Sequence, residues 1–483
     1  MSSLLLLIVL LGMSNSYGQG DKRLPPDAPD VPQQQPPPEP SPEPSLQEEL
    51  PTQPIPPALG APLLEQQLST SSNLAMDALL GGPDDSRLFI AVSLREEFSD
   101  NFDQENDNPQ RESRTTLTLG TRYRATGKGR YLSLTNTLDA NYQASDRVLQ
   151  IGFANLELDA GYAFPRWSLA FQDRFVRDDS LEEAFLTGAP RERTIFWRNN
   201  FAPRIRFQLS RLASFELAYT NILIRIEEGD QDDSVTDQIQ AIYQQQLTRT
   251  VRGGFSYTLV RSDNSSSDPA YDFTVAANAA YDLTRNISFD LRASWSYSNR
   301  APEDTDSLRY GGDISVRYRL LPELSLVIGV GVSRFDDEEG DPELLLTWQL
   351  GLNGILEIVP GTRPRLTSGQ SIVNTQGEVE DEGIVRRLTF SAQLEQDITR
   401  FIRLQLLANT AFTETLEGTQ DGDSNNDRKE LFWRIGANVS YQLTQTWSLA
   451  LRYEHRRRDA NRADDEFVEN RVLFSITGGF SAL

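Results

Sequence analysis

Residues 271–297 read YDFTVAANAAYDLTRNISFDLRASWSY, and this stretch decides the fold of the chain. On both sides of Thr284-Arg285-Asn286, apolar and polar residues alternate one by one. Successive side chains of a β-strand point to opposite faces, so the stretch predicts a hairpin with one apolar and one polar face. Each predicted strand has about a dozen residues, which exceeds a usual soluble strand and suits a tilted membrane crossing.

The composition excludes several functional classes. The 483 residues contain no Cys and a single His, His455, so disulfides, thiolate metal sites, cysteine nucleophiles and paired-histidine sites are excluded. Asp and Glu number 70 against 46 Lys and Arg, a formal net charge of −24 that argues against a nucleic-acid partner. A hydrophobic content of 38% is low for a soluble core of this size but fits a barrel with a polar interior. We expect no cofactor.

Three segments precede the hairpin pattern. Residues 1–18 contain LLLLIVLLG, which predicts a signal peptide, with a buried N-terminal strand or helix as the alternative. Residues 19–62 are rich in Pro, Gln and Glu and predict a disordered, extended periplasmic spacer. It is either a plain linker or a tether to a periplasmic partner or the cell wall. Residues 63–86 predict a short helix that stops at Gly81-Gly82, or a linker end.

From residue 87 to residue 483 the hairpin pattern repeats, with two kinds of connection. Tight connections fall at 163–167, 209–213, 247–251, 283–287, 320–324, 398–402 and 443–447. Longer acidic ones fall at 99–112, 178–193, 227–237, 301–306, 336–341, 378–382, 414–427 and 456–466, and we predict strict alternation of the two kinds. Short turns at one rim and long loops at the other are typical of outer-membrane barrels.

The predicted fold is therefore all-β, an antiparallel up-and-down transmembrane barrel. We count about 20 strands, or about 18 if the hairpin blurred by Pro360 and Pro364 does not form. A slip of phase near Ala154 predicts a β-bulge. Aromatic residues near the tight connections predict an interfacial girdle formed by Trp167, Tyr281, Tyr318, Tyr441 and Trp447.

The last predicted strand, residues 468–480, reads VENRVLFSITGGF. It resembles the closing strand of a bacterial outer-membrane β-barrel, which the barrel-assembly machinery recognises through a terminal aromatic residue. Here Ser481-Ala482-Leu483 follow Phe480. The whole arrangement is similar to that of β-barrel porins, some of them associated with exopolysaccharide secretion. The resemblance implies a Gram-negative outer membrane, an N-terminal segment in the periplasm, and membrane lipid, lipopolysaccharide and the assembly machinery as partners.

The candidate functional site is the barrel interior. On the predicted inward parity lie Arg122, Arg124, Asp272, Asp290, Arg292, Asp313, Arg317, Arg319, Arg403, Arg434, Arg452, Glu454 and Arg471. These residues either line a solute path or form charge ladders that only brace the wall. Together with further charged residues of that parity they nearly balance, so we expect no net sign in the interior.

Catalysis and metal binding are not expected. Barrel enzymes such as phospholipases need a Ser–His pair, whereas His455 lies on the outward parity with no serine partner nearby. Acidic runs such as 336–341 resemble calcium loops only loosely, since the full EF-hand pattern is missing. The predicted function is a passive channel for small solutes or for an exported polymer such as a polysaccharide. The alternative is a non-conducting structural or surface-display barrel, anchored by its Pro-rich segment.

Overall fold

A computed structural model describes residues 88–481, except for short stretches at 105–108, 128, 146, 179–194, 228–232, 265–268, 301–304, 322–323, 338–342, 355–360, 375–383, 418–428 and 462–465. The predicted signal peptide, the Pro-rich spacer and the short helix lie outside the described residues. Most of the predicted acidic connections do as well. Within the described part, no helix is long and apolar enough to cross a membrane.

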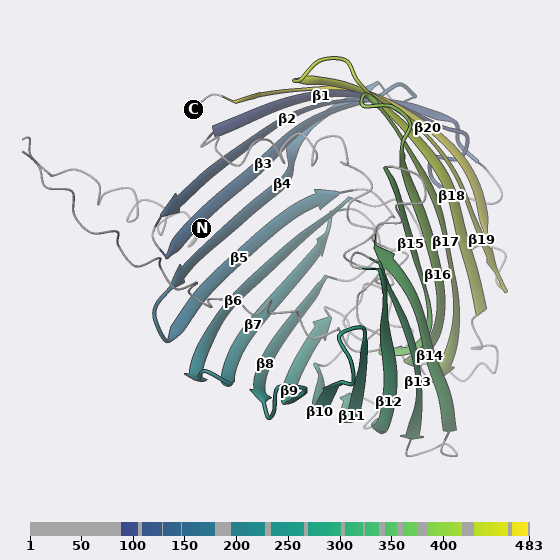
Figure 1. Cartoon of the computed structure of the whole chain (residues 1–483). Coiled ribbons are helices and arrows are strands. Elements are labelled where there is room, and N and C mark those ends of the chain that lie inside the picture. The colour runs from purple at the N-terminus through teal and green to yellow at the C-terminus, as the bar shows by residue number, and fades with distance from the viewer. Residues whose placement is uncertain are drawn as a thin grey trace, which may run out of the picture. The chain divides into compact units, whose positions relative to one another are not determined.

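The described residues form one antiparallel sheet of 20 strands (Figure 1). The strands are β1 Leu88–Ser99, β2 Glu112–Gly127, β3 Arg130–Gln143, β4 Val148–Ala163, β5 Trp167–Asp178, β6 Phe196–Ser210, β7 Ala213–Ile226, β8 Ser234–Gln246, β9 Val251–Asn264, β10 Ala270–Asp282, β11 Ile287–Arg300, β12 Thr305–Leu321, β13 Leu324–Asp337, β14 Glu343–Gly354, β15 Thr362–Asn374, β16 Ile384–Asp397, β17 Ile402–Glu417, β18 Lys429–Gln442, β19 Trp447–Ala460 and β20 Phe467–Ser481. Each strand pairs with its neighbours in the sequence.

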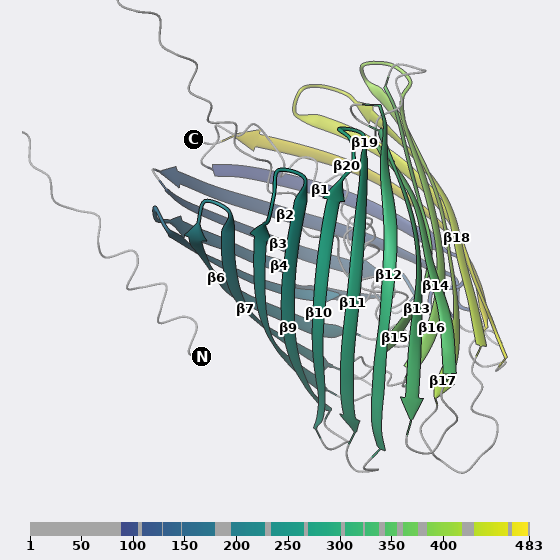
Figure 2. The ribbon, with the colours of Figure 1, turned by 60° about the horizontal axis from the view of Figure 1, so that its bottom comes forward.

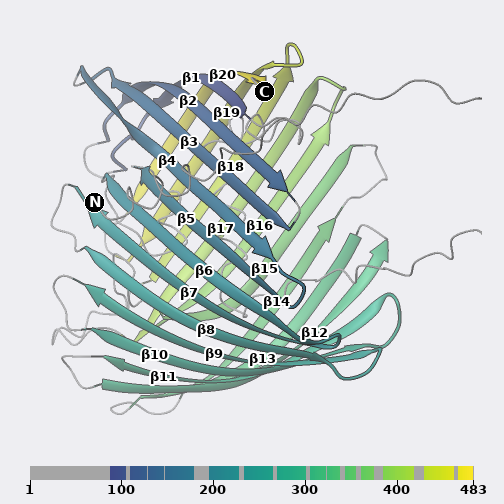
Figure 3. The same cartoon turned by 90° about the vertical axis from the view of Figure 1, so that its left-hand side faces the viewer.

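The sheet closes on itself, because the first strand pairs with the last. β1 and β20 are antiparallel partners from Phe89 opposite Ser481 to Ser99 opposite Arg471. In Figure 3 the strands of the near and far walls cross along opposite diagonals, as tilted strands of a closed barrel do. The predicted antiparallel up-and-down β-barrel is therefore confirmed.

The strand count of 20 rather than 18 is confirmed by the hairpin that the sequence left in doubt. β14 and β15 both form, but they pair only from Trp348 opposite Gln370 to Asn353 opposite Arg365. Pro364 lies just beyond this short ladder and on β15, opposite Leu394 of β16. A proline without an N–H is tolerated where one side of the strand has no ladder partner. This hairpin is therefore the least extensively paired one.

The predicted bulge is confirmed in β4. Thr137 of β3 lies opposite Asn155, whereas the next residue, Leu138, lies opposite Phe153. Ala154 is therefore the extra residue of a β-bulge, and the side-chain parity of β4 changes at this point.

The outer face of the barrel is apolar. Leu291 of β11, Val330 of β13 and Leu451 of β19 are 50–55% exposed, and large apolar residues are exposed on the same parity of most other strands. An apolar belt this extensive marks a surface that contacts lipid, since soluble proteins rarely expose large apolar patches. Every strand has between 12 and 17 residues, which is long enough for a tilted crossing.

Four of the tight turns share one local structure, and Figure 2 shows several of these turns along one rim. In the β10–β11 turn, Thr284 Oγ1 accepts hydrogen bonds from the backbone N–H groups of Asn286 at 3.1 Å and Ile287 at 3.0 Å. Thr248, Thr399 and Thr444 accept the corresponding two bonds in their own turns. A threonine hydroxyl that binds its own backbone two and three residues on stabilises such a turn.

The predicted strict alternation of tight and long connections holds only in part. We call the rim with the threonine turns the short-turn rim and the opposite one the long-loop rim. At the long-loop rim, four residues each, 144–147 and 301–304, join β3 to β4 and β11 to β12, although long connections were expected there. At the short-turn rim, seven residues, 355–361, join β14 to β15. Strands also run further into several predicted loops than expected, since β8 begins at Ser234, β17 ends at Glu417 and β19 ends at Ala460.

Candidate functional site: the barrel interior

Burial identifies the interior face of each strand. Glu97, Thr116 and Glu454 are fully buried, and they lie on the parity opposite to the exposed leucines of the outer face. The strand registers place every residue of the predicted lumen on this inward parity: Arg122, Arg124, Asp272, Asp290, Arg292, Asp313, Arg317, Arg319, Arg403, Arg434, Arg452, Glu454 and Arg471. This placement is compatible with bracing the wall and with lining a solute path.

The structure also places charged residues on the inward face that the sequence reading missed. The arginines are Arg95, Arg114, Arg198, Arg204, Arg206, Arg252, Arg309, Arg363, Arg365, Arg387, Arg456 and Arg458, and the acids are Glu97, Glu112, Glu157, Asp159, Asp397 and Glu430. Strand parity could have found them, since each lies on the inward parity of its own strand. Arginines therefore outnumber carboxylates on the described interior face, and the expected near balance is wrong.

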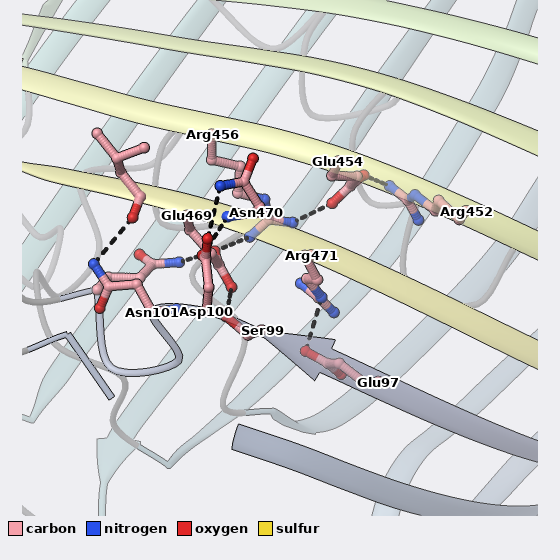
Figure 4. Close-up of polar contacts among 12 residues, drawn as sticks. Glu97, Ser99, Asp100, Asn101, Arg452, Glu454, Arg456, Glu469, Asn470 and Arg471 are labelled. Atoms are coloured by element: carbon pink, nitrogen blue, oxygen red, sulfur yellow. Dashed lines mark hydrogen bonds and ion pairs between the residues drawn. The ribbon is translucent and has the colours of Figure 1, made fainter. Parts of the chain in front are cut away.

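The most buried charges lie where β1 meets β20, a region we call the seam (Figure 4). Glu97 of β1 accepts a hydrogen bond from Arg114 of β2 at 3.0 Å and forms an ion pair with Arg471 of β20 at 2.8 Å. The three side chains are at most 5% exposed. One carboxylate of β1 therefore bridges its two neighbouring strands on the inside of the wall.

A second carboxylate pair continues the seam on β19 and β20. Glu454 forms ion pairs with Arg452 and with Arg456, the latter at 2.7 Å. Glu469 lies 3.8 Å from Arg456 and accepts a hydrogen bond from Ser99 at 2.7 Å. Arg456 thus connects two buried carboxylates on neighbouring strands.

The chain that leaves β1 folds inward and completes the seam. Phe102 and Gln104 are buried although they belong to a predicted outer loop. Gln104 adopts a positive φ of 60° and donates a hydrogen bond to Glu469 at 2.9 Å. Positive φ is uncommon for a residue other than glycine, and a bond to a buried charge offsets its cost. The Arg114 guanidinium lies 5.4 Å from the Phe102 ring centre.

Polar contacts also join β1 to β20 on the outer side of the long-loop rim. Asn470 donates from its backbone N–H to Asp100 at 2.6 Å and from its side chain at 2.7 Å. Asn101 donates to the backbone carbonyl of Val468 at 3.1 Å. These bonds are visible in Figure 4 beside the interior pairs. The seam is thus held from both faces of the wall at this rim.

Elsewhere the interior charges are more accessible to water. Arg403 of β17 contacts Asp397 at 2.8 Å and Glu395 at 3.2 Å, and its side chain is 48% exposed. Arg252 of β9 contacts Asp282 of β10 at 3.4 Å, with both side chains at least 40% exposed. The interior therefore has two kinds of surface, a dry charged seam and exposed charge ladders.

The predicted girdle residues all lie beside the short-turn rim. Tyr281, Tyr318, Tyr441 and Trp447 are exposed, and Trp167 is half-buried. Trp167 stacks on Phe164 with ring centres 3.8 Å apart. Their girdle role remains a prediction.

His455 lies on the outward parity near the long-loop rim, as expected. Its Nδ1 lies 2.8 Å from the side-chain oxygen of Asn470, and its ring centre lies 4.8 Å from that of Trp433. In the part of the chain that the structure describes, no three His, Asp or Glu side chains are arranged to hold a metal ion.

The sequence and the fold were then compared with known proteins. No family model and no curated protein matches the sequence. Among solved structures, OccAB3 of Acinetobacter baumannii is 11% identical at a TM-score of 0.39, and the match covers 82% of this chain and 100% of that one. OpdL of Pseudomonas aeruginosa is 12% identical at a TM-score of 0.40, with coverage of 82% and 100%. The siderophore receptor PirA of Pseudomonas aeruginosa is 9% identical at a TM-score of 0.46, with coverage of 82% and 81%. The fold assignment therefore stands on the strand registers of this chain.

Proposed function

We propose that this chain forms a passive channel in a bacterial outer membrane and passes small hydrophilic solutes. The observation that carries the proposal is a closed 20-strand barrel with an apolar outer face and a charged inner face. A barrel of about this strand number is wide enough for an aqueous lumen. Membrane lipid, lipopolysaccharide and the barrel-assembly machinery are the partners that such a location implies.

The exposed interior ladders lie at the ends of β9, β10 and β17 beside the short-turn rim, and they support a lumen whose mouth is open to water. Arg252, Asp282 and Arg403 keep 40–48% of their side chains exposed although they face inward. A charge in a dry core would cost several kcal/mol, so such residues are retained where water reaches them. Water inside the barrel is the requirement for diffusion of hydrophilic solutes.

An exported polymer such as a polysaccharide is the finer form of this proposal. β8 presents a row of uncharged amides to the interior, formed by Gln238, Gln240, Gln244 and Gln246. Amide groups donate and accept hydrogen bonds and therefore suit sugar hydroxyls. The row offers a neutral track beside the charged walls.

A non-conducting structural or surface-display barrel is the second candidate, and one observation favours it. Phe102 and Gln104 fold into the barrel at the seam and are buried there. A loop that turns inward narrows a lumen, and a fully closed lumen would leave the barrel as an anchor. The Pro-rich segment, residues 19–62, would then connect this anchor to a periplasmic partner or the cell wall.

Conductance separates the two candidates. Purified protein in a planar bilayer should show stepwise channels, with residues 19–86 present or removed. The acidic outer connections should give a weak cation preference at low salt that fades in 1 M KCl, because exposed charges are screened within about 3 Å there. Reversal potentials under a KCl gradient measure it. An anion preference at low salt would show instead that the interior arginines dominate. Absence of channels, with folding verified by heat-modifiable gel mobility, would favour the structural barrel.

Orientation is tested on intact cells. Because barrels of this class place long loops outside and short turns in the periplasm, an epitope inserted at Gly340 or Asp421 should bind antibody on whole cells. One inserted at Arg285, in a threonine turn, should stay inaccessible and should lower the yield of folded barrel. Equal labelling at Arg285 and Gly340 would contradict this orientation.

A further inference from the structure

Arginines recur at the tips of the tight turns. Arg249, Arg285 and Arg400 follow the threonines of three turns of the same hydrogen-bonded structure, and all three side chains are exposed. Arg166 and Arg211 occupy the tips of two other turns on the same rim. Five exposed cations therefore lie along the short-turn rim from β4 to β17.

The turns themselves do not require arginine. The threonine hydroxyl and the backbone supply the hydrogen bonds, as they do in the fourth turn, where Gln445 follows Thr444. Within the described part of the chain, Arg249, Arg285 and Arg400 form no hydrogen bond or ion pair through their guanidinium groups. Arg400 only covers the ring of Phe401, at 4.5 Å from its centre. Their shared position is therefore not explained by contacts among the described residues.

The long-loop rim has a different arrangement. There, three outward arginines are each paired with an aspartate two residues further along the strand. Arg261 contacts Asp263 at 2.9 Å and Arg334 contacts Asp336 at 2.8 Å. Arg457 contacts Asp459 at 2.6 Å. Local carboxylates compensate these charges, whereas no described carboxylate forms an ion pair with the arginines at the turn tips.

The position of the turn tips relative to the apolar belt points to a ligand. Leu247, Leu283 and Ile398 are exposed, and each lies two residues before the arginine of its turn. Two residues span at most about 7 Å of extended chain. The headgroup layer beyond the hydrocarbon is about 5–8 Å thick on each side. The guanidinium groups therefore lie at the level of the lipid phosphates.

We propose that the turn-tip arginines bind the phosphates of anionic glycerophospholipids in the leaflet that the short turns enter. A guanidinium presents paired N–H donors that match phosphate oxygens, and an anionic headgroup supplies the missing countercharge. The exposed leucine or isoleucine of each turn contacts the acyl chains of the same lipid. The proposal requires a barrel embedded in a membrane but no conductance, so it stands or falls separately from the channel.

The test is native mass spectrometry of the barrel in neutral detergent with equal amounts of phosphatidylglycerol and phosphatidylcholine. The wild-type protein should retain phosphatidylglycerol preferentially. In the triple variant Arg249→Gln/Arg285→Gln/Arg400→Gln, the preference for phosphatidylglycerol over phosphatidylcholine should decrease about fivefold for each altered turn. This factor is the usual contribution of one cation to binding at an anionic surface. Glutamine is compatible with this turn, as Gln445 shows. The matching Arg→Lys variant should keep most of the preference.

A control and a gain-of-function variant complete the design. Arg261→Gln/Arg334→Gln/Arg457→Gln changes the net charge by the same amount at paired sites, and it should leave the lipid preference unchanged. Gln445→Arg adds a cation to the fourth threonine turn and should increase phosphatidylglycerol retention. Equal retention of both lipids by the wild-type protein would overturn the proposal. An equal loss in the control variant would also overturn it, because net charge rather than position would then decide binding.

Discussion

Replacing Glu97 with alanine should lower the free energy of unfolding by about 3–5 kcal/mol, the usual cost of leaving a buried charge without its partner. Glu97 is 1% exposed and contacts Arg114 and Arg471 on the two neighbouring strands. Its removal leaves both guanidinium groups in a dry site without the carboxylate that balanced their charge. Because these contacts join the first strand of the barrel to the last, the loss should appear as a lower urea midpoint for the folded barrel.

The matched control is another inward carboxylate. Asp282 pairs with Arg252 at 3.4 Å, but both side chains are at least 40% exposed. Exposed pairs contribute about 0–1 kcal/mol, so Asp282→Ala should change the midpoint little. The triple variant Glu97→Leu/Arg114→Met/Arg471→Met should be less destabilised than Glu97→Ala, since the two guanidinium groups that contact Glu97 are removed together with it. Equal losses for Glu97→Ala and Asp282→Ala would mean that water reaches the seam.

Replacing Val330 with arginine should cost about 2–4 kcal/mol, because a cation near the middle of the lipid-facing surface is strongly unfavourable. Val330 lies midway along β13 and is 52% exposed on the outer face. Leu291 is also exposed to lipid, but it lies nearer the girdle, two pairs along the ladder from Tyr281. Leu291→Arg should therefore cost less than Val330→Arg, since the penalty decreases toward the interface. Folding yields and urea midpoints in lipid vesicles measure both.

Ser294→Arg is the control for the register. Ser294 lies on the inward face of β11 between Ala276 and Gly311, two neighbours whose small size leaves room for a longer side chain. Its replacement should be milder than that of Leu291 on the same strand. If Ser294→Arg proved the more damaging change, the pairing register of β11 would be shifted by one residue from the one described. Every side chain of the strand would then face the opposite side of the wall.

The sequence by itself determined the features that depend on neighbouring residues. Alternation in 271–297 predicted β10 and β11 and assigned their faces, because strand periodicity is local. Thr284 and its equivalents marked the turns, because a threonine hydroxyl bonds to backbone groups only two and three residues away. The inward parity of the predicted arginines followed from the same alternation.

Only the tertiary structure decided which of these inward charges meet. Glu97 and Arg471 carry no signal in the sequence that would pair them, since their contact depends on the register of β1 against β20. Packing at that junction, including the residues after β1, also decided that Glu97 is dry, whereas Asp282, the last residue of β10, stays exposed at the short-turn rim. Strand parity is a property of the backbone, whereas pairing and burial are properties of the closed barrel.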